Sequence, residues 1–240
     1  MSPPILVVNR VRKQFGAYTA LASIDLEVQD GERLGIIGPN GSGKTTLINC
    51  IAGLLLPDAG TISYLGKDIT ALPAYKRARL GIARSFQIPR PFTGMSVLEN
   101  LLVALDYLGG ERPRDLAVEV LDSIGLSGRC DDSSELLSQL ELRKLELARA
   151  LVARPRLLIA DETMAGLSEA EIDNILPILL RLNESGVAVI MIEHIMHAVM
   201  RFSQRLICME TGKIIANGTP RDIAADLVVQ KVYFGEQARR

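Results

Sequence analysis

The sequence contains the stretch Gly38-Pro39-Asn40-Gly41-Ser42-Gly43-Lys44-Thr45, directly after the apolar run Leu34-Gly35-Ile36-Ile37. Glycines let a backbone wrap around a polyphosphate with successive N–H groups pointing inward, and a helix that begins at the lysine adds its positive end. In a G-x-x-x-x-G-K-T pattern, Lys44 reaches the β and γ phosphates while the Thr45 hydroxyl holds Mg²⁺. A bare turn between a strand and a helix would not need Lys-Thr after its last glycine. The stretch therefore predicts a nucleotide phosphate cradle at the end of a buried strand.

Length and composition indicate a folded protein and argue against direct binding to nucleic acid or anionic lipid. The 240 residues allow one large domain or a core with an inserted subdomain, and 48% of them are hydrophobic. The net charge of −1 provides no basic field that would attract nucleic acid or anionic lipid. No apolar stretch approaches the roughly 20 residues that span a bilayer, and residues 1–4 do not begin a signal peptide. We expect a cytosolic protein that binds no nucleic acid and contacts a membrane only through a partner.

The three cysteines, Cys50, Cys130 and Cys208, are widely spaced and form no CxxC pair. Such spacing is typical of buried thiols in a reducing compartment, and it argues against a metal site built from cysteines.

The pattern of apolar residues indicates an α/β fold. Alternating apolar and polar residues over 24–29 predict antiparallel β structure before the strand that leads into the cradle. Continuous apolar runs at 157–160 and 187–192 predict parallel strands that are covered on both faces. Further predictions are a helix over 45–55, a short strand at 61–64, a hairpin of 205–209 with 213–216, and a helix from about Pro220.

Between about 89 and 153 the pattern becomes helical. Ser96-Val97-Leu98-Glu99 has the form of a capping box at the start of an apolar helix. A second helix begins at Pro113 and ends at Gly125. These helices have the character of an insertion into the α/β core.

A second motif consists of the four apolar residues 157–160 followed by Asp161 and Glu162. A strand that ends in this way beside the phosphate cradle presents both carboxylates to a bound nucleotide. Asp161 would anchor Mg²⁺ through its water shell, and Glu162 would polarise the water that attacks the γ-phosphate. Apolar strands that end in a solvated acid pair are common, but a cradle upstream favours a nucleotide-hydrolysing site.

With these motifs in this order, the chain resembles the ATP-binding subunits of ABC transporters over essentially all 240 residues. The resemblance implies a P-loop NTPase (RecA-like) α/β core with an N-terminal antiparallel β subdomain and an inserted helical subdomain. We expect one domain over 1–240, in which 1–88 and 154–216 form the nucleotide-binding core. The helical subdomain would occupy 89–153, and a C-terminal helical tail would occupy 217–240.

The resemblance also implies roles for single residues. Phe15 matches the aromatic that stacks on adenine, Gln87 the glutamine whose loop touches Mg²⁺ and faces the membrane subunit, and His194 the histidine that contacts the γ-phosphate. Residues 165–168 match the loop that passes signals between two ATPases. The implied catalytic residues are Glu162, His194 and Lys44, the Mg²⁺ ligands are Thr45, Gln87 and Asp161, and the ATP-binding residues are Phe15, Gly38, Asn40, Gly41, Ser42, Gly43, Lys44, Thr45, Thr46, Gln87, Asp161 and Ser138.

Several phrases are most similar to the importers of branched-chain and other hydrophobic amino acids. They are Arg84-Ser85-Phe86-Gln87, residues 95–101, residues 143–151, Met164-Ala165-Gly166-Leu167-Ser168 and the tail from 216 to 236. Urea and amide importers share these phrases, so they indicate a subfamily rather than a substrate. The tail disfavours an export or lipid-transport ATPase. A DNA-maintenance ATPase is disfavoured because residues 89–153 offer only short helices instead of coiled coils or zinc modules.

The chain departs from the family in its signature segment, residues Leu137–Glu141. The family pattern is Leu-Ser-Gly-Gly-Gln, or Leu-Ser-Tyr-Gly-Gln in this subfamily, whereas the chain has Leu-Ser-Gln-Leu-Glu. Leu140 replaces a glycine that lets the backbone approach the γ-phosphate on the opposite subunit, so we expect this contact to weaken. Glu141 matters less, because some family members have glutamate there, although a carboxylate about 6 Å from phosphate would cost roughly 3 kcal/mol per unit charge at an effective dielectric near 20.

The helix after the signature segment should nevertheless form. Ser138 and Glu141 make an S-x-x-E capping box, and Leu137 and Leu142 are placed for a hydrophobic staple. A second departure is Thr163, where the family has proline after the acid pair. We expect this change to loosen a turn without removing a catalytic group.

The resemblance implies an ATPase that uses ATP and Mg²⁺ and lies peripherally at the cytoplasmic face of the inner (plasma) membrane. Its partners would be integral-membrane permease subunits, a second ABC ATPase and, indirectly, a solute-binding protein. Each composite site of the ATPase dimer uses one subunit's cradle and the other's signature. Since the expected residues of the chain's own half-site are intact while the signature that it lends to the partner's site is altered, a heterodimer is favoured over a homodimer. The alternative is a slow-turnover regulatory ATPase that binds ATP and clamps a partner.

Overall fold

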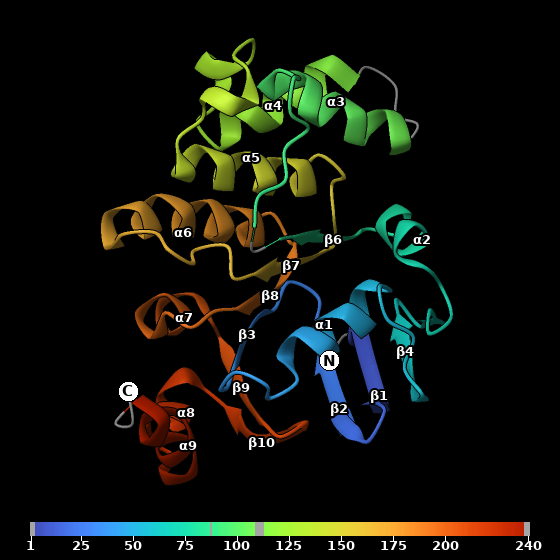
Figure 1. The fold of residues 1–240 in the computed structure, drawn as a ribbon. Helices are drawn as coiled ribbons and strands as arrows, with labels where there is room; N and C mark the ends of the chain where they lie inside the picture. The colour runs from blue at the N-terminus through green and yellow to red at the C-terminus, as the bar shows by residue number, and fades with distance from the viewer. Residues whose placement is uncertain (1–2, 87, 109–112, 238–240) are drawn as a thin grey trace.

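The computed structural model describes residues 3–86, 88–108 and 113–237 and contains two β-sheets (Figure 1). The larger sheet has the strand order β10-β9-β3-β8-β7-β6, and only the edge strand β10 runs antiparallel to its neighbour. The predicted strands at 157–160 and 187–192 and the closing hairpin are confirmed. The strands are β3 (Arg33–Ile37), β6 (Ile82–Ser85), β7 (Leu157–Asp161), β8 (Ala188–Ile192), β9 (Arg205–Glu210) and β10 (Lys213–Gly218).

Both faces of the larger sheet are covered, which explains the uninterrupted apolar runs. Successive side chains of a strand point to opposite faces. Val189 and Met191 of β8 accordingly lie in one hydrophobic cluster, while Ile190 and Ile192 lie in another. The helices that pack on the first face are α5 (Gln139–Leu151), α6 (Glu169–Glu184) and α7 (Met196–Phe202).

The smaller sheet is antiparallel, as predicted for the start of the chain, and has the order β2-β1-β4-β5. Its strands are β1 (Leu6–Phe15), β2 (Tyr18–Val28), β4 (Ala59–Tyr64) and β5 (Lys67–Asp68). Helix α1 (Lys44–Ala52) lies between the two sheets, because Leu47 and Ile48 share a hydrophobic cluster with residues of both. The helix ends before the predicted residue 55, since Gly53 takes the left-handed conformation at φ 78°.

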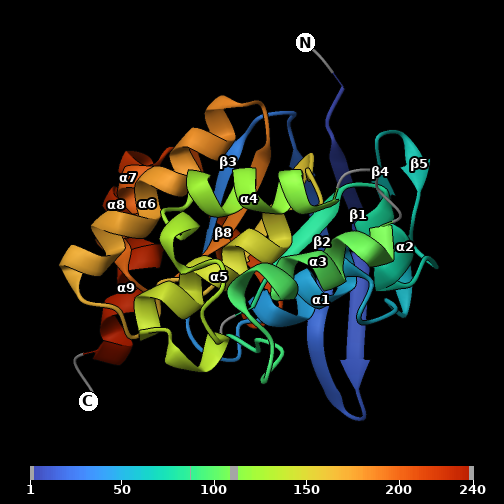
Figure 2. The same ribbon diagram turned by 90° about the horizontal axis from the view of Figure 1, so that it is seen from above.

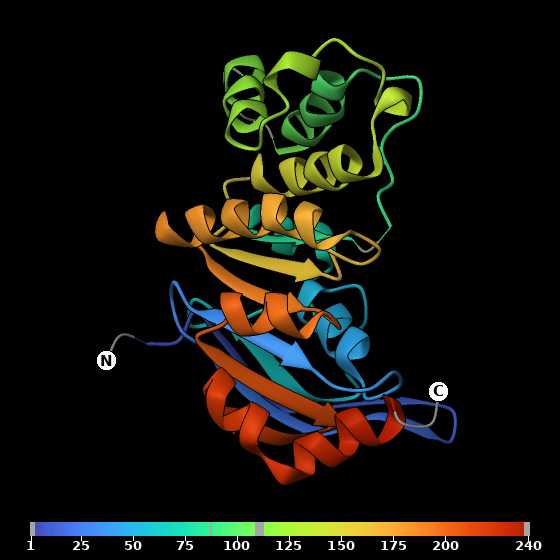
Figure 3. The same ribbon diagram turned by 90° about the vertical axis from the view of Figure 1, so that its left-hand side faces the viewer.

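Helices α3 (Val97–Leu108) and α4 (Pro113–Ser123) lie together with α5 at the top of Figure 1 and nearest the viewer in Figure 2. The predicted capping box is confirmed: the N–H of Ser96 donates to Glu99 Oε2 at 2.7 Å, and the N–H of Glu99 donates to Ser96 Oγ at 3.1 Å. Gly125, at φ 72°, follows the end of α4 as expected. Figure 3 shows the layers in order, with α3 and α4 above α5, then α6, then the strands of the larger sheet.

The C-terminal tail differs from the single helix expected from about Pro220. It forms two helices, α8 (Pro220–Ala225) and α9 (Leu227–Gln237). Asp226 separates them in an extended conformation, and its Oδ1 accepts from the N–H groups of Val228 and Val229 at 2.7 and 3.2 Å. An aspartate in this arrangement caps the second helix and ends the first.

A further helix, α2 (Ala74–Arg79), was not predicted and packs next to β6. Cys50 and Cys208 are buried as expected, whereas Cys130 is half-buried. Within the described ranges, none of the helices is both long and apolar enough to cross a membrane.

Candidate functional site

The phosphate loop, the acid pair and His194 gather at the carboxyl edge of the larger sheet, whereas Phe15 lies in the smaller sheet and Ser138 at the start of α5. The phosphate loop follows β3, Asp161 ends β7 and Glu162 follows it, and His194 comes shortly after β8. These three strands are parallel neighbours, so their carboxyl ends meet at one edge, where ligands bind in open α/β sheets. Gln87, which follows β6, lies outside the described residues.

The phosphate loop has the glycine conformations that a cradle requires. Gly38 has φ 149° and Gly43 has φ 102°. A Cβ atom would lie 2.2 Å from the carbonyl oxygen of Met209 at Gly38, and 2.5 Å from that of Ala20 at Gly43. Neither position can accept a side chain without moving backbone. The backbone of β9 and β2 therefore packs closely against the loop at these two glycines.

Two polar groups of the loop fit a polyphosphate. The buried Ser42 hydroxyl has no hydrogen-bond partner among the described residues. The Nζ of Lys44 donates to the carbonyl oxygens of Gly38 at 2.6 Å and Pro39 at 3.0 Å, so the ammonium is held within the loop. Burial lowers the pKa of Lys44, while Glu162, Cys208 and Asp161 oppose this shift. A bound phosphate would satisfy the hydroxyl and favour the charged lysine.

Asp161 is held by an ion pair that the sequence did not reveal. Arg84, from the end region of β6, donates from Nη2 to Asp161 Oδ2 at 2.6 Å and from Nη1 to Asn49 Oδ1 at 2.6 Å. Thr45 and Asp161 both line a cavity of about 400 Å³. A hydroxyl and a carboxylate are hard oxygen donors of the kind that Mg²⁺ accepts beside phosphate and water. Across the described part of the chain, no cluster of three or more His, Cys, Asp or Glu side chains could hold a metal by itself.

Glu162 and His194 are in direct contact. The Nε2 of His194 lies 2.6 Å from Glu162 Oε1, although the residues are 32 positions apart in sequence. Glu162 has φ 49°, an unusual conformation for a residue with a side chain, and its N–H donates to the carbonyl of Ile192 at 2.8 Å. This strained turn directs the carboxylate away from the strand and toward the histidine. The structure thus brings together the two residues that the resemblance assigns to γ-phosphate chemistry.

Phe15 pairs with Tyr18 at the hairpin of the smaller sheet, and Tyr18 contacts the phosphate loop. Phe15 is 48% exposed at the end of β1, which excludes a role as a core aromatic. The hydroxyl of Tyr18 donates to the carbonyl of Gly41 at 2.9 Å and ties the hairpin to the loop. An exposed aromatic beside a phosphate cradle is suited to stacking on a base.

The signature segment begins helix α5 with the predicted capping box. The N–H of Ser138 donates to Glu141 Oε2 at 2.8 Å, and the N–H of Glu141 donates to Ser138 Oγ at 3.3 Å. These bonds, led by the Ser138 N–H, lower the pKa of Glu141. Leu137 is buried, and Leu142 and the half-buried Leu140 pack against the same helical cluster. Leu140 therefore has a packing partner within its own subunit.

A buried charged network lies behind the edge of the sheet. Arg143 of α5 donates from Nη2 to the carbonyl of Ala165 at 2.9 Å, which connects α5 to the loop after the acid pair. Glu193 is buried and accepts from the N–H of Met164 at 2.8 Å through Oε1. Burial raises the pKa of Glu193 to about 7. Thr163 occupies the position where the family has proline. It is buried, and its hydroxyl has no hydrogen-bond partner in the described residues.

Sequence reasoning missed Arg84, Arg129, Arg143 and Glu193. Arg84 and Glu193 stand next to strand ends, and a charged residue at such a place is a signal in principle. Neither Arg129 nor Arg143 carries a local signal for its most distant contact, because Glu141 lies 12 residues after Arg129 and Ala165 lies 22 residues after Arg143.

An apolar groove of about 530 Å³ lies between the core and the helices at the top of Figure 1. Residues of α2, β6, α3 and α5 line it. Tyr75, Phe86 and Tyr107 are exposed there, and the guanidinium of Arg84 lies 4.9 Å from the ring centroid of Phe86. Arg84 lines both this groove and the cavity beside Asp161, so one side chain touches both.

Comparisons with known proteins agree with this geometry. A family profile described as "ABC transporter" matches residues 21–165. The branched-chain amino acid transport ATP-binding protein BraF of Pseudomonas aeruginosa is 36% identical, over 98% of this chain and all of that protein. The lipopolysaccharide export ATP-binding protein LptB of Haemophilus influenzae is 34% identical, over 97% of this chain and 98% of its own length.

Solved structures show the same fold. An ATP-binding cassette of an ABC transporter in its ADP conformation superposes with a TM-score of 0.90 at 33% identity, covering 98% of this chain and 100% of its own. A dimeric ATP-binding cassette bound to ADP and Pi has a TM-score of 0.80 at 26% identity, covering 90% and 99%.

Proposed function

The chain belongs to the ABC transporter family, and on that premise we propose that it hydrolyses ATP to drive uptake of branched-chain or other hydrophobic amino acids through partner permease subunits. The observation that carries the proposal is the meeting of Lys44, Asp161, Glu162 and His194 at one edge of the parallel sheet. Relatives named for branched-chain amino acid transport support the substrate class. The site arrangement supports the ATPase activity.

The residues at the carboxyl edge of the larger sheet have different roles in ATP hydrolysis. Lys44 and the loop N–H groups bind the β and γ phosphates, and the Ser42 hydroxyl adds a further contact. Glu162 polarises the attacking water, and His194, in contact with it, donates a hydrogen bond toward the γ-phosphate. Phe15 stacks on the adenine. Asn40, Gly41 and Thr46 complete the cradle.

Thr45 and Asp161 are the described residues that would hold Mg²⁺, and Gln87 is the third ligand that the family resemblance implies. A Mg²⁺ ion held by these residues would supply positive charge to offset the negative charge of the phosphates. To serve as a ligand, Asp161 must share its carboxylate between the metal and Arg84.

The apolar groove beside Phe86 is the docking surface for a helix of a permease subunit. Its exposed aromatic residues support this assignment, as does its lining by Phe86, which directly precedes Gln87 in the sequence. Through this contact the chain lies peripherally at the cytoplasmic face of the membrane, and a solute-binding protein joins only indirectly.

A second ATPase completes the nucleotide sites, and we favour a heterodimer. This chain's own half-site contains all of the expected catalytic groups, while its signature segment has lost the glycine at Leu140. A homodimer would use the altered signature twice, whereas a heterodimer would use it once. The dimeric cassette among the similar structures supports pairing, without specifying the partner.

Purification of the intact complex from its host tests the proposal. The co-purifying proteins should include permease subunits and a second ATPase. The complex, reconstituted in vesicles, should accumulate radiolabelled leucine in an ATP-dependent manner, with urea and a lipopolysaccharide precursor as comparison substrates. Transport of urea or the lipid in place of leucine would overturn the substrate class, and the absence of any permease would overturn the transport function.

A further inference from the structure

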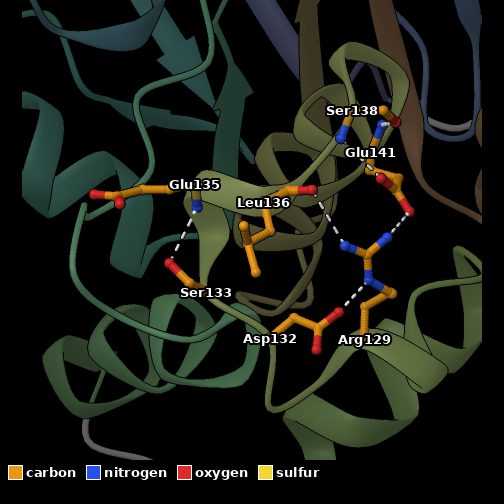
Figure 4. Close-up of polar contacts among 7 residues, drawn as sticks. All are labelled: Arg129, Asp132, Ser133, Glu135, Leu136, Ser138 and Glu141. Carbon is orange, nitrogen blue, oxygen red and sulfur yellow. Dashed lines mark hydrogen bonds and ion pairs between the residues drawn. The ribbon is translucent and has the colours of Figure 1, made fainter.

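Arg129 holds the turn that leads into the signature segment through three contacts (Figure 4). It ends the short 3-10 helix η1 (Ser127–Arg129) and donates from Nη1 to Glu141 Oε1 at 2.6 Å. Its Nη2 donates to the carbonyl of Leu136 at 3.2 Å, and its Nε pairs with Asp132. One guanidinium thus connects Asp132 and Leu136, which precede the signature segment, with Glu141 at its end.

Both oxygens of Glu141 are consequently engaged. Oε1 accepts from Arg129, while Oε2 accepts from the N–H of Ser138 in the capping box. Figure 4 shows the carboxylate between these two donors. The Ser138 hydroxyl accepts from Glu141 in return, and Ser138 itself stays exposed at the helix start.

A carboxylate in a segment that approaches a triphosphate is unfavourable unless a positive charge compensates it. Two like charges a few ångströms apart repel, and the repulsion is strong where water is excluded. A guanidinium in hydrogen-bond contact cancels most of this field, and it also restricts where the carboxylate points. The altered signature carries such a carboxylate, and Arg129 is the cation in contact with it.

We propose that Arg129 is a positioning residue of the composite ATP site, where it neutralises Glu141 and keeps that carboxylate on the capping box. The altered signature segment can then approach the triphosphate held by the partner ATPase. This inference rests on the proposed ATPase dimer, and it assigns to Arg129 the compensation for a glutamate in the signature.

Arg129 could instead act only by bracing the turn through Leu136 and Asp132. The two roles are separable, because the substitution Glu141→Gln would keep the capping-box acceptor and lose the charge. If the charge matters, Glu141→Gln should rescue the loss of Arg129. If only the brace matters, the rescue should fail, since the contacts of Arg129 to Leu136 and Asp132 stay absent.

The experiment uses the complex purified through a tag on this chain, with Glu162→Gln in this chain. The remaining ATPase activity then belongs to the partner's site, which the signature segment completes. On that background, Arg129→Met should lower kcat/KM about tenfold. Arg129→Met with Glu141→Gln should return it to within about twofold of the starting value, and Arg129→Lys should give an intermediate loss. High salt should reduce the loss, because it screens the uncompensated charge.

Arg156→Met is the matched control, since Arg156 pairs with Asp30 at 2.7 Å on the far side of the core and should leave kcat/KM unchanged. ATP affinity of the isolated subunit should be the same in all variants and reports correct folding. Unchanged kcat/KM in Arg129→Met, or a loss that Glu141→Gln fails to rescue, would overturn the inference. A starting complex without turnover at the partner's site would instead refute the proposed dimer.

Discussion

At the scale of single residues, the site depends on two groups with different tasks. In the proposed mechanism, Lys44 binds phosphate from within the loop, whereas Glu162, which contacts His194, acts on water. Removing each should therefore affect a different step.

The first prediction concerns these two residues. Lys44→Ala should abolish measurable ATP binding, because the buried loop loses its ammonium group. In the isolated subunit, Glu162→Gln should bind Mg-ATP with unchanged affinity and lose turnover by at least about a hundredfold, since an amide keeps the shape but does not polarise water. Isothermal titration and steady-state ATPase assays measure the two effects. Unchanged ATP affinity in Lys44→Ala would contradict the assignment of the cradle.

The second prediction concerns Glu193 and pH. With its pKa raised to about 7 from an ordinary 4.5, folded Glu193 keeps a proton that the unfolded chain releases. The folded state thus binds more protons between about pH 4.5 and 7, so the free energy of unfolding contributed by this group falls as pH rises through that window. Glu193→Gln should be as stable as the wild type near pH 4.5 and more stable at pH 8, by up to about 3 kcal/mol. Urea unfolding at both pH values measures the difference.

Glu184→Gln, at an exposed glutamate of α6, is the control for this measurement and should leave the pH dependence unchanged. If Glu193→Gln unfolded with the same pH dependence as the wild type, the buried carboxyl would not be the source of the slope.

At the scale of elements, helix α5 connects the interface segments of the chain. Its capping box fixes Ser138 at the start of the helix. Arg143, two residues after Glu141, donates to the carbonyl of Ala165. The helix therefore links the signature segment to the loop after the acid pair through a hydrogen bond.

The third prediction tests the altered position in this helix. Leu140→Gly frees the backbone to approach the γ-phosphate, and a recovered charge-assisted hydrogen bond should raise turnover about ten- to hundredfold. The same change removes a half-buried side chain and adds a helical glycine, so the free energy of unfolding should fall by at least about 1 kcal/mol. Steady-state ATPase assays measure turnover, with the rate of the Glu162→Gln variant as the baseline. Thermal unfolding measures the change in stability.

Leu140→Ala is the matched variant, because it loses the same packing and keeps a Cβ atom. It should be destabilised without a comparable gain in turnover. Equal rates for wild type and Leu140→Gly, both well above the Glu162→Gln background, would show that Leu140 is tolerated and would remove the argument for a heterodimer.

At the scale of the whole molecule, the groove and the nucleotide site adjoin across β6. Arg84 lines both cavities and pairs with Asp161, so a helix that filled the groove would lie beside the side chain that holds a proposed metal ligand. The arrangement offers a short physical route between docking and hydrolysis.

The fourth prediction tests the groove. Ala104→Glu places a carboxylate in the apolar lining, so permease subunits should no longer co-purify with the chain. ATP affinity of the isolated subunit should stay within about twofold, because the substitution does not reach the cradle. Leu227→Glu, at an exposed leucine of α9 outside the groove, is the control and should preserve the complex. Normal recovery of permease subunits with Ala104→Glu would place the docking surface elsewhere.

The sequence by itself determined the features that depend on neighbouring residues. Each of these features depends on residues that lie within a few positions of one another. They are the cradle, the acid pair, the alternating strand at 24–29 and the capping boxes at Ser96 and Ser138. Their geometry follows from local backbone rules, so a linear pattern suffices to predict them.

Only the tertiary structure decided which distant groups meet. The Arg84–Asp161 pair joins residues 77 positions apart, and the contact between Glu162 and His194 joins residues 32 apart. The burial that raises the pKa of Glu193 depends on packing around it, and the place of Arg129 beside Glu141 depends on the path of a turn. Such pairings have no signature in the order of residues, because the folded path of the chain, rather than local propensity, sets the distances between side chains.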